Sequence, residues 1–300
     1  MARLFFTIIC ISITIFNAAE IFCQQVPVEP ASFDEKTLEL QVKLDRLGIR
    51  PGVIDGKPGR KTEQAYNTWR RISGAAELIS TAPAVTTYTL TAGDFEGLAP
   101  APKEWRAKSQ VKSLGYENVL ERLTERFHAS EELLQKLNPE IDWTRLKPGT
   151  IVKVPDVGEG LKGRAERLEI LLDEKLIRAI DAGNRIIAQF PCSIAQKVAK
   201  QPVGTLRITT IIKDPAFTFD PEVFTEVHNI KEKLLIPPGP NNPVGVRWIA
   251  LSRAGYGIHG TPEPLSIGKT GSHGCFRLSN WDAESLADLV EVGTPVIIKR

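Results

Sequence analysis

Cysteine and histidine are scarce in this sequence, which has four of each among 300 residues, and its formal net charge is only +2. A net charge this small gives no strong positive field, and this argues against nucleic acid as the partner. The chain has no internal repeat, no low-complexity tract, and no His-x-His or Cys-x-x-Cys pair of the kind that zinc sites commonly contain. Cysteine and histidine that lie together in such a sequence therefore require a chemical reason.

The chain also lacks an apolar run of the roughly 20 residues that a transmembrane helix needs. The segment Leu4–Phe16, 13 residues long, is almost entirely apolar, follows Arg3 and precedes the small residues Asn17-Ala18-Ala19. A basic start, a short apolar core and small residues at its end are typical of a secretory signal. We predict a cleaved signal peptide over residues 1–19, with an uncleaved anchor as the alternative; the protein is exported in both cases.

Export changes what the cysteines indicate. Cys10 would leave with the signal peptide, so Cys23, Cys192 and Cys275 would remain in the mature chain. These cysteines are too few for the disulfide framework of a small secreted domain, and their number is odd. We therefore expect at least one free thiol.

Residues 33–74 have the pattern of two short helices around a glycine-rich turn. Ser32 lies three residues before Glu35, which is the spacing of a capping box at a helix start. The first helix has an apolar stripe at Leu40, Leu44 and Leu47 and ends at Gly48, and Asp55-Gly56 is a turn signal. A second helix is expected from Thr62; the residues on its apolar face are Ala65, Tyr66, Trp69 and Ile72. The runs LELQVKLDRLGI and GVIDGKPGRKTEQA, with Trp69, resemble the peptidoglycan-binding type 1 domain; the alternative is a generic helical hairpin.

Residues 86–157 indicate the order strand, helix, helix, strand. We expect a strand within Tyr88–Asp94, a helical stretch over Tyr116–Leu137 interrupted at Ala129-Ser130, and a last strand over Ile151–Val154. The runs YTLTAGD, LNP and LKPGTIVKVP resemble a LysM module, which implies binding of N-acetylglucosamine chains beside the first strand–helix connection. An extra segment, Phe95–Gly115, lies in that connection, so the alternative is a LysM fold that serves as a spacer.

From Arg164 to Arg300 the sequence changes to short β-rich runs such as LEILL, LRITTII, RWIALS and PVIIKR. Short strands at close spacing predict an all-β sandwich or barrel. One helix is expected near the end of the chain, capped by Ser279 or Asn280 and stopped by Gly293, with a buried stripe of Leu286, Leu289 and Val290.

The segment GSHGCFRLSN, Gly271–Asn280, places a scarce histidine and a scarce cysteine around one glycine, and GYGIHG upstream ends in His259-Gly260. A cysteine attacks carbonyl groups as the thiolate, and a histidine within hydrogen-bond reach can take its proton to leave a thiolate–imidazolium pair. The imidazolium can later protonate a departing amine, while a backbone carbonyl orients the ring. Backbone N–H groups beside Cys275 can form an oxyanion hole, and Arg277 can hold a carboxylate.

Two other uses of these residues are compatible with the sequence. Cys275 could form a disulfide bond with Cys192. Alternatively, His259, His273 and Cys275 could bind zinc as the three nitrogen and sulfur ligands of a catalytic metal site. No further pair of metal-ligating residues in the sequence supports the zinc alternative.

The same residues resemble the signature of the L,D-transpeptidase, or YkuD-type, catalytic domain, and the resemblance covers residues 164–300. The signature is a histidine, then Ser/Thr-His-Gly-Cys, then arginine or asparagine; this chain has His259-Gly260, Ser272-His273-Gly274-Cys275 and Arg277. The resemblance implies that Cys275 is the nucleophile and that His259 is the base and acid, oriented by the Gly260 carbonyl. It implies supporting or substrate-binding roles for the others: His273, Ser272, Gly274 and Arg277.

The resemblance also implies a substrate. Cys275 would form a thioester with a peptidoglycan stem tetrapeptide, release D-alanine and transfer the acyl group to an amine of another stem or of a wall-attached protein. The implied partners are stem peptides and glycan strands in the periplasm or cell wall of a bacterium, with no metal, no cofactor, no nucleic acid and no membrane after signal cleavage. The alternatives are an L,D-carboxypeptidase that uses the same cysteine, and a wall-binding scaffold with an inert catalytic domain.

The expected fold is multidomain. It consists of a small all-α wall-binding domain at 33–74, an α/β LysM-like module with an insertion at 86–157, and a mainly-β, sandwich-like catalytic domain at 164–300. Nothing in the sequence indicates an oligomeric state.

Overall fold

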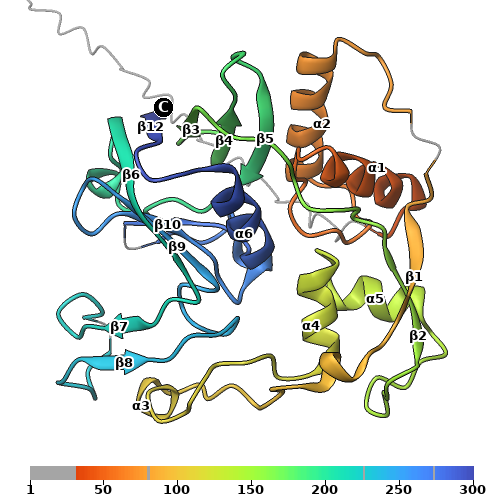
Figure 1. The fold of residues 1–300 in the computed structure, drawn as a ribbon, viewed down its shortest axis with the longest axis horizontal. Coiled ribbons are helices and arrows are strands. Elements are labelled where there is room, and N and C mark those ends of the chain that lie inside the picture. Colours follow the sequence, from red (N-terminus) through yellow and green to blue (C-terminus); the bar gives the residue numbers. More distant parts are fainter. Residues whose placement is uncertain (1–31, 80–81, 226, 273) are drawn as a thin grey trace, which may run out of the picture. The chain divides into compact units, whose positions relative to one another are not determined.

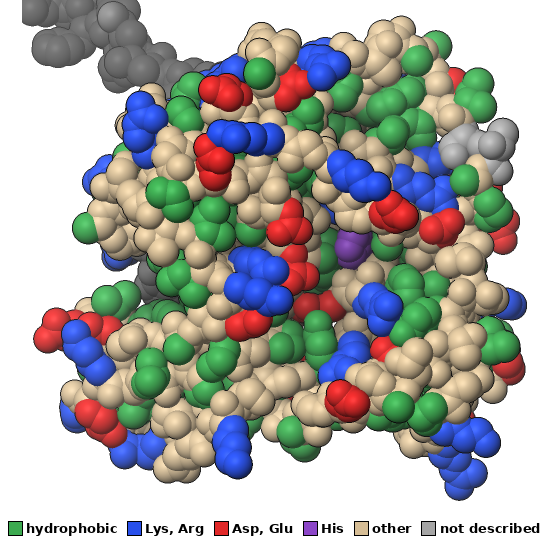
Figure 2. Space-filling model, viewed as in Figure 1, with side chains coloured by type: hydrophobic (Ala, Val, Ile, Leu, Met, Phe, Trp, Pro, Cys, Tyr) green, Lys and Arg blue, Asp and Glu red, His purple; other side chains and the backbone are tan. Residues whose placement is uncertain are grey.

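The computed structural model describes residues 32–79, 82–225, 227–272 and 274–300. These residues belong to one compact unit, and none of their helices is long and apolar enough to cross a membrane. The predicted signal peptide at 1–19, Cys10, Cys23 and His273 lie outside the described residues. Figure 2 shows Lys and Arg interspersed with Asp and Glu over one face of the molecule, as expected from the small net charge.

Two helices, α1 (Glu35–Arg46) and α2 (Arg60–Ser73), begin the described part of the chain (Figure 1). The predicted cap of the first helix is wrong: Asp34, not Ser32, is the N-cap, because its carboxylate accepts the Thr37 N–H at 2.8 Å. A carboxylate at this position also interacts favourably with the positive end of the helix dipole. The helix therefore begins at Glu35, directly after its cap.

The buried face of α1 differs in part from the predicted stripe. It contains three apolar residues that are at most 4% exposed: Leu38, Val42 and Leu44. Leu47 is 51% exposed, because α1 ends at Arg46 and the chain then turns at Gly48, whose φ is 74°. Ile72, in the last turn of α2, is likewise 44% exposed and does not belong to the buried face of that helix.

The region after α2 has the predicted order of strand, helix, helix and strand. Its elements are β1 (Val85–Thr89), the 3-10 turn η1 (Ala92–Phe95), the short helix α3 (Trp105–Lys108), α4 (Val119–Arg126), α5 (Glu131–Leu137) and β2 (Ile151–Pro155). β1 and β2 pair antiparallel. The strand predicted to enter a turn over Tyr88–Asp94 begins earlier, at Val85, and the expected turn is η1, where the Asp94 carboxylate accepts the Thr91 N–H at 2.7 Å and closes a capping box.

The extra segment Phe95–Gly115 packs against the C-terminal half of the chain. The ring of Trp105 lies 4.6 Å from the ring of Phe219 in strand β7 (Phe217–Phe219), which pairs with β8 (Leu234–Ile236). Leu114, 1% exposed, joins the same hydrophobic cluster, and its N–H donates to the Pro238 carbonyl at 2.8 Å. The segment therefore links residues 86–157 to the β7–β8 pair of strands (Figure 1).

The C-terminal region is built on one eight-stranded sheet with the order β11-β10-β9-β6-β12-β3-β4-β5. The strands are β3 (Arg167–Leu171), β4 (Leu176–Ile180), β5 (Ile186–Pro191), β6 (Gly204–Lys213), β9 (Arg247–Leu251), β10 (Gly257–His259), β11 (Phe276–Arg277) and β12 (Pro295–Lys299). Two 3-10 turns, η2 (Val198–Lys200) and η3 (Pro264–Ser266), lie in the connections. The abundance of short strands in this region was predictable, but their arrangement was not.

The predicted mainly-β, sandwich-like domain contains one curled sheet, because the two halves of the sheet share strand β6. Residues 204–207 of β6 pair with β12 and residues 208–213 pair with β9, with an irregular register between Ile208 and Thr210. An irregularity of this kind bends a strand. The sheet curls so far that the chain after β5 reaches β11 at the opposite edge, where Ser193 pairs with Arg277.

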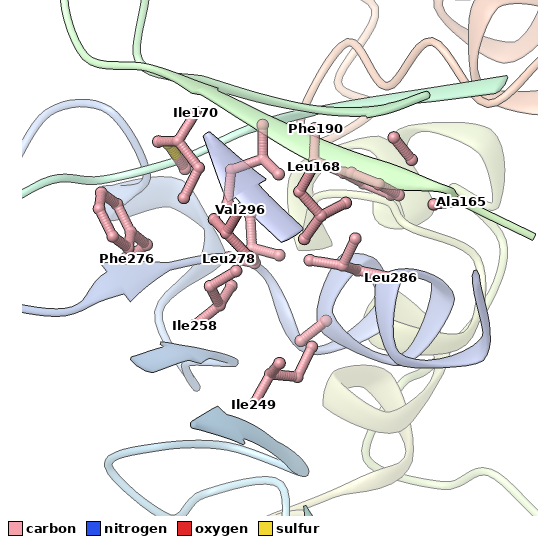
Figure 3. Packing of buried hydrophobic residues seen from close by; sticks show 14 of the residues in the cluster. Ala165, Leu168, Ile170, Phe190, Ile249, Ile258, Phe276, Leu278, Leu286 and Val296 are labelled. Carbon is pink, nitrogen blue, oxygen red and sulfur yellow. The ribbon is translucent and has the colours of Figure 1, made fainter. Parts of the chain in front are cut away.

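Helix α6 (Asn280–Leu289) packs against the curled sheet and confirms the predicted C-terminal helix. Ser279 is its N-cap, since the hydroxyl accepts the Asp282 N–H at 3.3 Å. Leu286 is fully buried, and Figure 3 shows it pointing toward Leu168 and Val296 of the sheet. The apolar face of α6 thus covers apolar side chains of the sheet.

A buried charged cluster joins the N-terminal helices to α6. The guanidinium of Arg50 contacts the carboxylate of Asp45, and its Nε lies 3.4 Å from Oδ1 of Asp282 in the first turn of α6. His128 Nδ1 lies 3.0 Å from Oδ1 of Asp45. Burial opposes the ionisation of Asp45, but the charges of Arg50 and His128 hold the pKa of that carboxyl below its ordinary value. Asp45 is therefore the anion that balances the buried Arg50.

Replacing Asp45 with alanine would leave the Arg50 charge buried without this partner. Breaking a buried ion pair from one side costs about 3–5 kcal/mol, so we expect Asp45→Ala to lower the free energy of unfolding by that amount in urea titrations. Glu159→Ala is the control, because Glu159 and its partner Lys162 are 84% and 83% exposed, and exposed pairs contribute about 0–1 kcal/mol. Equal small losses in both variants would contradict a structural role for the cluster.

Candidate active site

Cys275 directly precedes β11, which pairs in parallel with β10, the strand that ends at His259. In β10 and β11, Ile258 is opposite Phe276 and His259 is opposite Arg277, so Cys275 lies one position before the paired segment. Ile258 and Phe276 are at most 1% exposed and point into the core of the sheet. Since side chains alternate along a strand, His259, Cys275 and Arg277 share the other face.

His259 is held in one orientation and kept from water. Its Nδ1 lies 2.6 Å from the Gly260 carbonyl oxygen, which makes Nδ1 the N–H donor and leaves Nε2 as the basic nitrogen. Burial lowers the pKa of His259 to about 4; the Gly260 carbonyl opposes this shift, and the charge of Arg277 adds to it. At neutral pH the imidazole is therefore uncharged.

Cys275 is a free, half-buried thiol. Its Sγ lies 3.7 Å from the Gly255 carbonyl oxygen, at the long end for a thiol donor. Burial raises the pKa of Cys275 above its ordinary value, and the hydrogen bond from the Gly257 backbone opposes this only in part. Burial therefore favours the neutral form of both side chains.

Trp248 is a site residue that our reading of the sequence missed. It lies in β9 directly opposite His259, and the two rings stack with centroids 5.6 Å apart and planes inclined by 23°. Gly257 makes room for the indole, since a Cβ there would lie 2.6 Å from an indole carbon. The alternation in RWIALS carried a signal, because Ile249 and Leu251 point into the core and leave Trp248 on the face of His259.

The loop before Cys275 is held by two of the predicted supporting residues. The Ser272 hydroxyl donates to the Cys275 carbonyl and accepts the Gly274 N–H at 3.3 Å. Arg277 Nη2 donates to the carbonyl oxygens of Thr270 and Gly271 at 3.1 and 3.3 Å and contacts the Thr270 hydroxyl. Of the two uses considered for Arg277, these contacts favour support of the loop. His273 lies outside the described residues, so its role stays a prediction.

Cys192 is too deeply buried to serve the site. It is 0% exposed within the main core cluster, and burial raises the pKa of its thiol to about 12. Both Cys192 and Cys275 are free thiols, which contradicts the disulfide alternative. Cys192 is therefore a small apolar residue of the core.

The arrangement agrees with a comparison against protein families, in which the L,D-transpeptidase catalytic domain known as YkuD matches residues 165–298. These residues form an L,D-transpeptidase catalytic domain. The match begins at Ala165, just before β3, and ends at Ile298, in β12.

Relatives of the transpeptidase domain carry the same description. A putative L,D-transpeptidase YkuD of Bacillus licheniformis is 26% identical over 180 residues, which are 60% of this chain and 93% of that protein. A probable L,D-transpeptidase YbiS of Escherichia coli is 29% identical over 173 residues, 54% of each chain, so this chain spans about half the length of YbiS. An L,D-transpeptidase structure from Mycobacterium smegmatis is 20% identical, with a TM-score of 0.36, over 54% of this chain and 80% of that one.

The position of Trp248 in the transpeptidase domain leads to a prediction on pH dependence. Trp248→Ala would admit water to the imidazole, so the pKa of His259 should rise from about 4 toward the ordinary value near 6.5. The acid limb of kcat/KM should move upward in the same direction, because His259 must be neutral to act as a base. Ring-nitrogen NMR titration and the pH–rate profile measure both. Trp248→Phe keeps a covering ring and is the control; an unchanged acid limb in Trp248→Ala would count against shielding by the indole.

Proposed function

We propose that this protein is an exported peptidoglycan L,D-transpeptidase that cross-links stem peptides, or attaches a protein to them, through a Cys275 thioester. The observation that carries the proposal is the pairing of β10 with β11, which places Cys275 on the same side of the sheet as His259, whose Nδ1 is already bonded to the Gly260 carbonyl. Only Nε2 of that ring remains free to accept a proton. A cysteine with such a base is suited to acyl transfer.

In the proposed acylation, the Cys275 sulfur attacks the carbonyl of the L-centre that precedes the terminal D-alanine of a stem tetrapeptide. The thiol proton moves to Nε2 of His259 during the attack, because the resting pair is neutral. The C–N bond to D-alanine then breaks, and the imidazolium returns the proton to the departing amine. The products are a thioester on Cys275, free D-alanine and neutral His259.

Transfer reverses the roles of the two side chains. An amine of a second stem, or of a wall-attached protein, attacks the thioester carbonyl and gives its proton to Nε2 of His259. The C–S bond breaks, and the sulfur recovers the proton as the thiol. Backbone N–H groups of the Ser272–Cys275 loop are the candidates for binding the oxyanion in both steps, and the bonds of Ser272 and Arg277 support that loop.

For the N-terminal regions we propose different roles. Residues 33–74 fit a peptidoglycan-binding type 1-like domain, which would bring the enzyme to the wall. Residues 86–157 fit a LysM-like module used as a spacer, because the segment Phe95–Gly115, in the connection where LysM modules bind sugar, packs on the β7–β8 hairpin. A signal peptide at 1–19 and a site of action in the periplasm or cell wall complete the proposal.

Incubation of the full protein with a stem tetrapeptide tests the reaction by mass spectrometry. We expect a dimer that has lost one D-alanine; a monomer that has lost D-alanine and gained water would mean that the enzyme is a carboxypeptidase. Cys275→Ala removes the nucleophile and little volume, so both products should disappear while the circular dichroism spectrum is unchanged. Residual turnover within tenfold of the wild type would refute the cysteine mechanism.

Metal chelation tests the zinc alternative. Because the proposed steps use only Cys275, His259 and backbone groups, treatment with EDTA should leave D-alanine release unchanged. Activity that is lost with EDTA and restored by added zinc would replace this mechanism with a metal-dependent one.

A further inference from the structure

Asn280, the first residue of α6, is a buried polar side chain that the steps above do not use. It is 1% exposed and connects three segments of the chain. Its Nδ2 donates to Oε1 of Glu125 at 2.7 Å and to the Pro240 carbonyl at 3.0 Å. Its Oδ1 accepts the Val246 N–H at 3.3 Å. A buried amide with this many partners has one fixed orientation.

The carboxamide of Asn280 lies directly against the peptide that orients His259. A Cβ on Gly260 would lie 2.3 Å from Oδ1 of Asn280, and one on Gly245 would lie 1.9 Å from it. Only glycine permits such an approach at either position. The Gly260 carbonyl accepts the Nδ1 proton of His259. Asn280 therefore fills the space beside the peptide that orients the imidazole.

Glu125, in α4, provides the contact from the N-terminal half of the chain. Burial raises the pKa of Glu125 to about 8; the hydrogen bond from Asn280 opposes the shift, and the carboxylates of Glu121 and Glu284 add to it. At neutral pH Glu125 is therefore an uncharged acid whose Oε1 accepts the Asn280 amide. Its Oε2 lies 3.4 Å from the Tyr116 hydroxyl.

We propose that Asn280 is a positioning residue for His259, acting through the Gly260 peptide, and that Glu125 holds Asn280 in place. The N-terminal region then takes part in the reaction by fixing the tautomer of the base, apart from any binding to the wall. The effect on turnover rests on the proposed function, but the effect on the imidazole does not.

Loss of this support should lower kcat and leave KM nearly unchanged. A misplacement of about 1 Å at a reacting group can cost on the order of 100-fold in rate, so Asn280→Ala should reduce kcat by roughly 10- to 100-fold. The ring of His259 should also change from a single Nδ1–H tautomer to a mixture, which the 15N shifts of its ring nitrogens report. A purely structural role would lower the melting temperature without changing either quantity.

Substitutions at Glu125 keep the test decisive if Asn280→Ala does not fold. Glu125→Leu removes the acceptor and should lower kcat several-fold and broaden the tautomer signals, whereas Glu125→Gln keeps an oxygen acceptor and should recover most of the lost rate. Glu121→Leu is the matched control, since Glu121 lies one turn earlier on α4 and bonds to Nδ2 of Asn241 at 2.7 Å instead.

The positioning role of Asn280 and the proposed function are contradicted by different results. Wild-type kcat and a single His259 tautomer in both Asn280→Ala and Glu125→Leu would overturn the positioning role, as would an equal loss in Glu121→Leu. If the wild-type protein processes no stem peptide at all, the proposed function fails, while the NMR comparison, which needs no substrate, still decides the role of Asn280.

Discussion

The closure of the curled sheet between Ser193 and Arg277 is the constraint on which the site depends. Each of the two residues donates its N–H to the carbonyl of the other at 2.9 Å. Strand β11 has only two residues and would otherwise be an edge strand, which is the least firmly held position in a sheet. Pairing with β10 on one side and Ser193 on the other fixes the backbone that follows Cys275. The position of Cys275 therefore depends on contacts between residues more than eighty positions apart in the chain.

The burial of His259 and Cys275 influences the protonation of both side chains. Trp248 covers the imidazole, Gly257 allows the indole to lie close, and the thiol is only partly open to water. A low dielectric around the two side chains opposes a resting thiolate–imidazolium pair. It also strengthens the interaction of nearby dipoles with the charge that develops on a reacting carbonyl. The free enzyme can thus hold a neutral pair in which charge develops only as a substrate is attacked.

The sequence predicted candidate residues and the order of elements better than the geometry. His259 and Cys275 stand out because scarce residues lie in a glycine-rich signature, and residues 86–157 have the predicted order of strand, helix, helix and strand. The register irregularity at Ile208 has no comparable signal, and short strands at close spacing are compatible with both a sandwich and a barrel. Ser32 and Asp34 are both good caps, and which of the two is used depends on how the backbone enters the helix. Trp248 and Asn280 were missed because their partners come from strand pairing and from distant segments.

The polar contacts of the N-terminal half reach strand β5 and the first turn of α6. The Gly48 carbonyl accepts the N–H of Gln189 in β5, and the Gln189 carbonyl accepts the N–H of Arg50, both at 2.8 Å. The Arg50 side chain then reaches Asp282 in the first turn of α6, and Glu125 reaches Asn280 in the same turn. Buried polar pairs contribute little net stability, but their hydrogen bonds form in only one arrangement of the segments that carry them. These two pairs meet in the first turn of α6, which lies against Gly260, the residue whose carbonyl accepts the Nδ1 proton of His259.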